Sequence, residues 1–240
     1  MNEFVCDRIR LRMDKRLEKF YKPIALLLGE DVDYYVAGNS CNSSAPNDYD
    51  VYPIENEFDF DEIKTYAEKM KMPIASETKN ALTIIINGTP VQFCSYIKPS
   101  LLSLIESFDF AHIQIGIGVH NEWDGEYECS EIKEIQTTCA WEESQLLNTT
   151  WYTHSEYPLS SLLRCVKYAQ RGDFAGKSWK VSMMDIVKDI VERGYKDYDD
   201  FKDQISAIDL ALLDENESNS AFELFQTFQN KGLVSNWVKE

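Results

Sequence analysis

The sequence predicts an α+β fold, in which a mixed sheet with flanking helices is followed by a small helical domain. Short runs of β-branched and aromatic residues, separated by turn-forming residues, occupy residues 33–119. Farther along the chain, apolar residues recur at helical spacing instead. Hydrophobic residues make up 44% of the 240-residue chain, which is enough to bury a core. We therefore expect an α/β domain at residues 1–125 and a helical domain at residues 126–240.

The first expected element is a helix over residues 6–29. Gly29 suits the position just past its end, and apolar residues recur at three- and four-residue spacing: Ile9, Met13, Leu17 and Phe20. Seven basic residues against four acidic ones stand in residues 1–22. We expect the arginines of this helix to form a solvated face.

Two short strands should follow, at residues 33–38 and 49–54. The segment 39–47 between them is built of small, polar and turn-forming residues, which predicts a loop or one turn of helix. Apolar residues at helical period then predict a helix over 59–71.

The segments 81–87 and 90–97 are β-branched runs on either side of Gly88-Thr89, and together they predict a hairpin. A short helix is expected at 99–107, opened by a Pro-Ser pair. Residues 111–119 alternate well enough to form another strand or the start of a buried helix.

The remaining chain reads as helices. Four groups of apolar residues at helical spacing mark them: Leu159, Leu162, Leu163, Val166 and Ala169; Met183, Ile186, Val187 and Ile190; Ile205, Ile208 and Leu212; Phe222, Phe225 and Phe228.

Charge and cysteine usage bound the class of protein. The formal net charge of −17 disfavours a general nucleic-acid binder, although a local basic face remains compatible with it. The six cysteines form no C-x-x-C pair, so we expect reduced thiols. Because no apolar run has the length of a membrane helix and the N-terminus lacks a secretory pattern, we expect a cytoplasmic protein without membrane contact.

The candidate metal-binding and phosphate-binding residues lie in the segment 37–52, AGNSCNSSAPNDYDVY. A strand delivers Gly38 and Ser40 into a small-residue loop, and Asp48 and Asp50 lead into the next strand. Two aspartates one residue apart on a strand point to the same face and can hold a hard cation such as Mg²⁺. Glycine lets a phosphate approach the backbone closely. In an acidic chain, a solvated strand end is the competing interpretation of the aspartate pair.

This pattern resembles the G-S…D-x-D signature of the polymerase-β-like nucleotidyltransferase superfamily, and looks most like the head domain of CCA-adding tRNA nucleotidyltransferases and bacterial poly(A) polymerases. Three further stretches resemble later motifs of that family and occur in the same order along the chain. ALTIIINGTPVQFCSY is similar to the strand pair after the D-x-D, FDFAHIQIG at 108–116 is similar to the R-R-D-F-T-I-N block, and PLSSLLRCVKYAQRGDF at 158–174 is similar to the P-L-R-L-L-R helix.

The resemblance implies a nucleotidyltransferase-like fold that moves an NMP from an NTP to an acceptor, with Mg²⁺ or Mn²⁺ as cofactor. It implies that Asp48 and Asp50 are the catalytic metal ligands. The implied nucleotide-binding residues are Gly38, Asn39, Ser40, Asp109, Arg164 and Lys167. Asp109 equally suits a capping role, and Arg164 and Lys167 equally suit a solvated helix face.

The sequence departs from the family's motifs at positions that bear on which acceptor and which nucleobase it would recognise. Phe108 stands where the family has an arginine, Gln92 stands where relatives can carry a third carboxylate, and the element that reads the base has no counterpart. Three hypotheses remain open: a transferase whose acceptor is an RNA end, a protein or a small molecule; a degenerate site that binds a nucleotide or a protein partner without turnover; and an acidic interaction protein that uses residues 185–217, where eleven acids face four bases.

Overall fold

The computed structural model describes residues 3–29, 31–43, 46–123, 128–197, 199–201 and 204. The chain divides into two compact units, Met1–Leu147 and Asn148–Glu240. The helices expected from residue 205 onward lie outside the described residues. Among the described helices, none combines the length and apolar character needed to cross a membrane.

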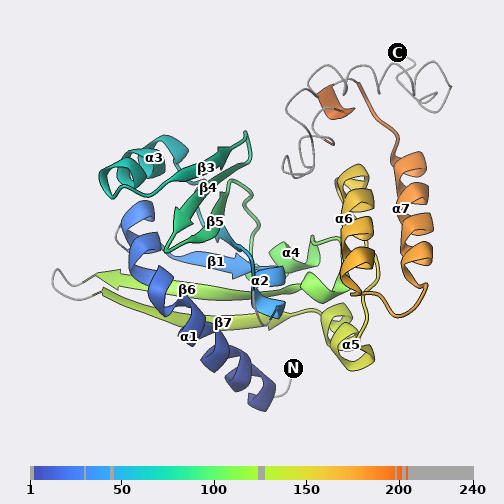
Figure 1. The fold of residues 1–240 in the computed structure, drawn as a ribbon, viewed down its shortest axis with the longest axis horizontal. Coiled ribbons are helices and arrows are strands. Elements are labelled where there is room, and N and C mark those ends of the chain that lie inside the picture. The colour runs from blue at the N-terminus through green and yellow to red at the C-terminus, as the bar shows by residue number, and fades with distance from the viewer. Residues whose placement is uncertain are drawn as a thin grey trace. The chain divides into compact units, whose positions relative to one another are not determined.

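The first unit is built on a seven-stranded mixed sheet in the order β3-β4-β5-β2-β1-β6-β7 (Figure 1). Only the β2–β5 pair among its neighbouring strands is parallel. The strands are β1 (Tyr34–Ala37), β2 (Tyr49–Pro53), β3 (Ile74–Glu77), β4 (Ala81–Ile86), β5 (Thr89–Cys94), β6 (Ile115–Trp123) and β7 (Glu128–Thr137). The helices are α1 (Glu3–Leu28), α2 (Asn39–Asn42), α3 (Phe60–Lys69), α4 (Leu101–Glu106) and α5 (Cys139–Leu147), with a 3₁₀ turn, η1, at Ala111–Ile113.

The expected α+β fold, a mixed sheet with flanking helices, is confirmed. β1 and β2 are antiparallel neighbours, and β4 and β5 form the expected hairpin. Its turn is Asn87-Gly88, one residue earlier than expected, and both residues have positive φ. This is the backbone that a two-residue hairpin turn requires, and Asn-Gly adopts it readily.

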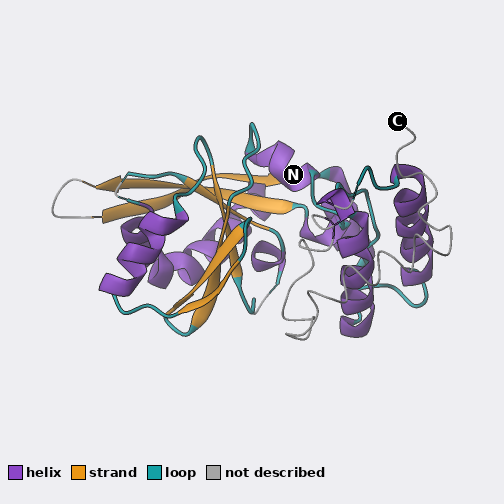
Figure 2. Ribbon diagram, turned by 90° about the horizontal axis from the view of Figure 1, so that it is seen from above, coloured by secondary structure: helices purple, strands orange, loops and turns teal. Residues whose placement is uncertain are grey.

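The two faces of the sheet differ in their cover. One face carries the main core, in which Val36, Val51 and Phe93 are fully buried beneath α1 and α3. The opposite face carries a smaller cluster formed by Tyr35 and Ala37 of β1 with three residues of α4, Leu101, Leu104 and Ile105. Figure 2 shows how strongly the sheet twists between its two ends.

Gly116 of β6 lets α4 lie close to this second face. A Cβ at Gly116 would stand 2.6 Å from Leu101 Cδ1 and 3.1 Å from Ile105 Cγ2. Contacts this short are not tolerated in a packed interior, so a residue without a side chain is needed there.

The boundary between the units falls later than the expected residue 125. β7 pairs with β6 from Glu128 to Thr137, so the stretch after residue 125 begins as a strand of the sheet and not as a helix. α5 follows it in the same unit, and the helical part begins after Leu147.

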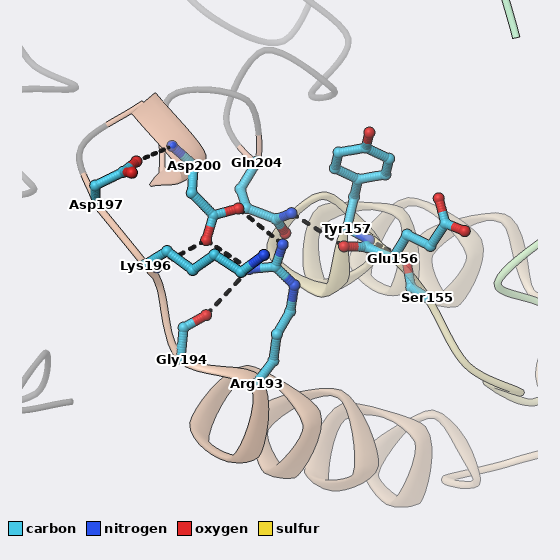
Figure 3. A network of polar contacts seen from close by, with 9 residues as sticks. All are labelled: Ser155, Glu156, Tyr157, Arg193, Gly194, Lys196, Asp197, Asp200 and Gln204. Carbon is cyan, nitrogen blue, oxygen red and sulfur yellow. Dashed lines mark hydrogen bonds and ion pairs between the residues drawn. The ribbon is translucent and has the colours of Figure 1, made fainter. Parts of the chain in front are cut away.

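The second unit contains α6 (Pro158–Arg171) and α7 (Trp179–Arg193), which pack against each other. Beyond α7, Arg193 holds the chain through a two-pronged ion pair (Figure 3): Nη2 lies 2.8 Å from Asp200 Oδ1, and Nη1 lies 3.1 Å from Asp200 Oδ2. Gln204 donates to the carbonyl of Glu156 at 3.0 Å. The Arg193 guanidinium lowers the pKa of the Asp200 carboxyl from its ordinary value.

Candidate functional site

Gly38 lies between β1 and α2 as the N-cap residue of α2, with φ 86° and ψ −147°. This backbone strongly favours glycine. Its N–H donates to the carbonyl of Ile115 at 2.9 Å, which fixes the turn to β6. A Cβ at Gly38 would lie 3.8 Å from Asp50 Oδ2 and 3.8 Å from Phe108 Cε2. Gly38 is buried, and the space that a side chain would take there adjoins a carboxylate oxygen and an aromatic ring atom.

Asp50 lies in the middle of the sheet, in β2. It pairs with Ala37 of β1 on one side and with Gln92 of β5 on the other. In β2 the buried and half-buried residues alternate, so Asp50 and Tyr52 share the face opposite the main core. The Asp50 side chain is half-buried, so part of it is exposed to solvent on that face.

Asp48 precedes β2 and is exposed. The structure therefore brings Gly38 and Asp50 together, while Asp48 stands just before the strand. That both carboxylates bind one cation stays a prediction.

The donor set suits a hard cation. Asp48 and Asp50 offer carboxylate oxygens, and the register partner of Asp50 is an amide side chain, Gln92. The described part of the chain contains no group of three or more His, Cys, Asp or Glu side chains arranged to hold a metal ion. A cation at this pair would therefore take its remaining ligands from phosphate oxygens and water, as Mg²⁺ commonly does.

Ser40 and Asn39 occupy the one-turn helix α2. The Ser40 side chain is buried, and its hydroxyl donates to the carbonyl of Ala37 at 3.3 Å. Asn39 is half-buried. The Ser40 hydroxyl thus stabilises the turn after β1 in this structure, and its expected contact with phosphate stays a prediction.

Cys41 is not arranged as a nucleophile. It is buried, its thiol donates to the carbonyl of Val36 at 3.3 Å, and burial raises the pKa of the thiol to about 12. Because the thiolate is the nucleophilic form, this cysteine is inert near neutral pH.

Three arginines of α1 bind backbone carbonyls, where the sequence predicted a solvated face. Arg12 Nη2 donates to the carbonyl of Cys41 at 2.5 Å, and Arg16 Nη1 donates to the carbonyl of Ser43 at 2.7 Å. Arg10 donates to the carbonyl of Ile132 in β7. Cations at the carbonyl end of a helix are favourable, so Arg12 and Arg16 hold α2 and the loop beyond it. Burial, followed by the charge of Arg16, lowers the pKa of Arg12.

Phe108 and Asp109 follow α4. Asp109 is buried, and Phe108 is half-buried with its Cε2 atom 3.8 Å from the point where a Cβ of Gly38 would stand. Gln114 Nε2 donates to the Phe108 carbonyl at 2.7 Å, and the Thr138 hydroxyl donates to Gln114 Oε1 at 2.7 Å. This buried link fixes the backbone of the Phe108 loop. The position of Phe108 was not foreseen, because it depends on how α4 packs across the sheet.

Arg164 and Lys167 lie on α6 of the second unit. Arg164 Nη2 donates to Ser160 Oγ at 3.0 Å, one helical turn earlier, and Lys167 is exposed. Their expected contact with a triphosphate stays a prediction.

No family model matches the sequence, and no curated protein matches it. Among solved structures, the chain is similar to one titled "tRNA-processing enzyme (apo form I)", with 14% identity and a TM-score of 0.47. It is also similar to "The complex structure of CCA-adding enzyme with CTP", with 14% identity and a TM-score of 0.45. The matches cover 94% and 95% of this chain but only 60% and 51% of those chains. The likeness is one of overall fold, and at these scores it says nothing about activity.

Proposed function

We propose that this chain is a metal-dependent nucleotidyltransferase that moves an NMP from an NTP to an acceptor. The observation that carries this proposal is the Asp50 carboxylate beside the positive-φ turn at Gly38. A carboxylate that binds a cation and a glycine that admits phosphate are the two groups that positioning a triphosphate needs.

In this reaction an acceptor oxygen forms a bond to the α-phosphorus of the NTP. The bond from that phosphorus to the bridging oxygen breaks, and pyrophosphate leaves with the electron pair, while the acceptor proton passes to solvent. A bound Mg²⁺ or Mn²⁺ would supply charge neutralisation on the phosphate oxygens. Asp50 and Asp48 would hold that cation, and Gly38 would let the phosphates lie against the turn after β1.

The test is transfer of labelled nucleotide from each of the four NTPs to RNA, protein and small-molecule acceptors with Mg²⁺ or Mn²⁺. We expect Asp50→Asn to lower transfer by about a hundredfold or more, since it removes charge stabilisation that the reacting phosphate needs. The matched control is Asp61→Asn, which changes a highly exposed aspartate on α3 and should leave transfer unchanged. Equal transfer by wild type and Asp50→Asn would contradict the proposal.

Nucleotide binding gives a second test that does not depend on the acceptor. A ligand that binds only the folded state adds stability by mass action, about 2.7 kcal/mol at one hundred times its Kd. We expect Mg²⁺ with an NTP to raise the melting temperature of wild type but not of the double variant Asp48→Asn/Asp50→Asn. Equal stabilisation of both proteins would place the nucleotide elsewhere.

Two observations favour the alternative of a degenerate site that binds a nucleotide without turnover. An amide, Gln92, is the register partner of Asp50 where a carboxylate would add a third ligand, and the Ser40 hydroxyl is turned to the backbone. NTP-dependent stabilisation without transfer to any acceptor would support this alternative over the transferase.

For an RNA end as acceptor the structure offers a basic groove along α1, whose lining includes no residue of the Gly38–Asp50 pair. A groove of about 560 Å³ is lined by Lys15, Arg16, Glu18, Lys19, Pro46, Tyr49 and Thr89. Its three cations offset the repulsion that an acidic protein otherwise exerts on a phosphate backbone. Transfer to RNA should then fall steeply as salt rises, whereas transfer to a neutral small acceptor should not.

A further inference from the structure

Aromatic side chains gather beside the Gly38–Asp50 pair. Tyr52 stands two residues after Asp50 on the same face of β2, and Phe108 stands just beyond α4. Their ring centroids are 6.0 Å apart with the planes inclined at 43°. Both rings are half-buried and pack on the smaller cluster beneath α4, so they are held in place yet keep exposed surface.

Phe108 and Asp50 flank the same spot. The edge of the Phe108 ring and the Asp50 carboxylate each lie 3.8 Å from the point where a Cβ of Gly38 would stand. A nucleotide whose phosphates lie against Gly38, with a cation at Asp50, therefore begins next to an aromatic surface. The phosphates of that nucleotide would contact the cation at Asp50, and its base would contact the aromatic ring of Phe108.

The loop that carries Phe108 is fixed from two sides. Gln114 holds the Phe108 carbonyl, and Thr138 holds Gln114 in turn. α4, which leads into the loop, packs closely on Gly116. A fixed ring loses little freedom when a ligand stacks on it, so the stacking free energy is kept for binding.

A third aromatic residue, Tyr96, belongs to the same cluster. Lys98 Nζ lies 4.5 Å from the centroid of its ring, so the face of Tyr96 already has a cation on it. Phe108 is the ring that adjoins the Gly38 position, and Tyr52 packs against it.

We propose that Phe108, supported by Tyr52, is the stacking platform for the nucleobase of the NTP. This inference rests on the proposed function and names how its substrate is recognised. Every base has a π-face, so stacking on an aromatic ring holds a base without reading its hydrogen-bonding edge. The substrate class is therefore an NTP of any base, with the affinity divided between the cation–triphosphate contacts and the ring.

The test separates these two parts of the affinity. Dissociation constants are measured by titration calorimetry with Mg²⁺ for ATP, CTP, GTP, UTP and inorganic tripolyphosphate, which has no base. We expect wild type to bind the four NTPs with Kd values within a few-fold of one another. Phe108→Leu should weaken all four by about tenfold while leaving tripolyphosphate unchanged, because it removes a ring and keeps an apolar side chain.

Phe108→Trp should restore NTP binding to the wild-type level or better. Tyr66→Leu is the matched control, since Tyr66 is a half-buried aromatic residue on α3, packed against the main core. It should leave both kinds of ligand bound as in wild type.

Three outcomes would overturn the inference. NTP binding by Phe108→Leu that equals wild type removes the platform. Equal weakening of NTP and tripolyphosphate in Phe108→Leu assigns Phe108 a structural role only. Tripolyphosphate and NTP binding that are both absent from wild type overturn the proposed function, and the platform with it.

Discussion

The two faces of the sheet are built for different purposes. The face under α1 and α3 is apolar and closed, with Val51 and Phe93 fully buried. The face under α4 combines the carboxylate of Asp50 with half-buried rings and a glycine turn. Since β2 contributes alternate residues to both faces, one strand supplies both stability and the candidate chemistry. Substitutions on the closed face should therefore lower stability, whereas substitutions on the face under α4 should alter ligand binding, even where the two residues are neighbours in β2.

The largest loss of stability should come from the closed face. Phe93→Ala removes a fully buried ring from the main core, and we expect it to lower the free energy of unfolding by about 3–5 kcal/mol. Denaturant unfolding measures the change. A loss below about 1 kcal/mol would show that this face is not the main source of stability.

The next largest effect should come from the seat of α4. Gly116→Ala places a Cβ 2.6 Å from Leu101 Cδ1, so the Leu101 side chain or α4 must shift, and we expect a loss of about 1–3 kcal/mol. Gly118→Ala is the matched control on the same strand, because its new Cβ meets mainly the flexible side chain of Glu134. Equal effects of the two substitutions would contradict the close packing of α4.

Alkaline pH should weaken the closed face through Cys41. Burial raises the pKa of its thiol to about 12, from 9.0. The folded state keeps the thiol neutral, so this stability is fully present below the pKa of the unfolded thiol. It is lost progressively as the pH rises toward 12. We expect Cys41→Ala to unfold with a shallower pH dependence than wild type between pH 9 and 12. An unchanged slope would contradict the burial of the thiol.

The smallest effect on stability should come from the open face. Asp50→Asn keeps the shape of a half-buried side chain, and we expect the free energy of unfolding to change by about 0.5 kcal/mol or less. The same denaturant unfolding measures it. A loss as large as that of Phe93→Ala would show that Asp50 serves the core and not a ligand.

Local patterns predicted what is local in the structure. The Asn87-Gly88 hairpin and the strand–turn–strand from β1 to β2 depend on neighbouring residues, so the sequence contains their signals. β3 was missed because it is an exposed edge strand without apolar alternation. β7 was missed because a register shift near Gly118 breaks its alternation, which places Ile132 and Ile135 out of step.

The candidate site also contains contacts that the local sequence predicts and contacts that it does not. The approach of Asp50 to Gly38 follows from the register of two adjacent strands, and the G-x-S…D-x-D spacing predicts it. The approach of Phe108 to Gly38 depends on α4 and β6, and the contacts of Arg12 and Arg16 depend on how α1 crosses the fold. Such contacts join residues far apart in the chain and leave no periodic signal.

The parallel pairing of β2 with β5 has a consequence for how the molecule assembles. Asp50 and its register partner Gln92 are separated in the chain by α3, β3 and β4. Gly38 and its hydrogen-bond partner Ile115 are separated by a longer stretch that also includes α4. The β4–β5 and β6–β7 hairpins close short loops, whereas these pairings close long ones at a greater entropic cost. We expect pulse-labelled hydrogen exchange to protect the two hairpins first and the amide of Gly38 late. The carboxylate would then reach its place among the last events of folding, so a nascent or truncated chain would hold secondary structure before it holds a site.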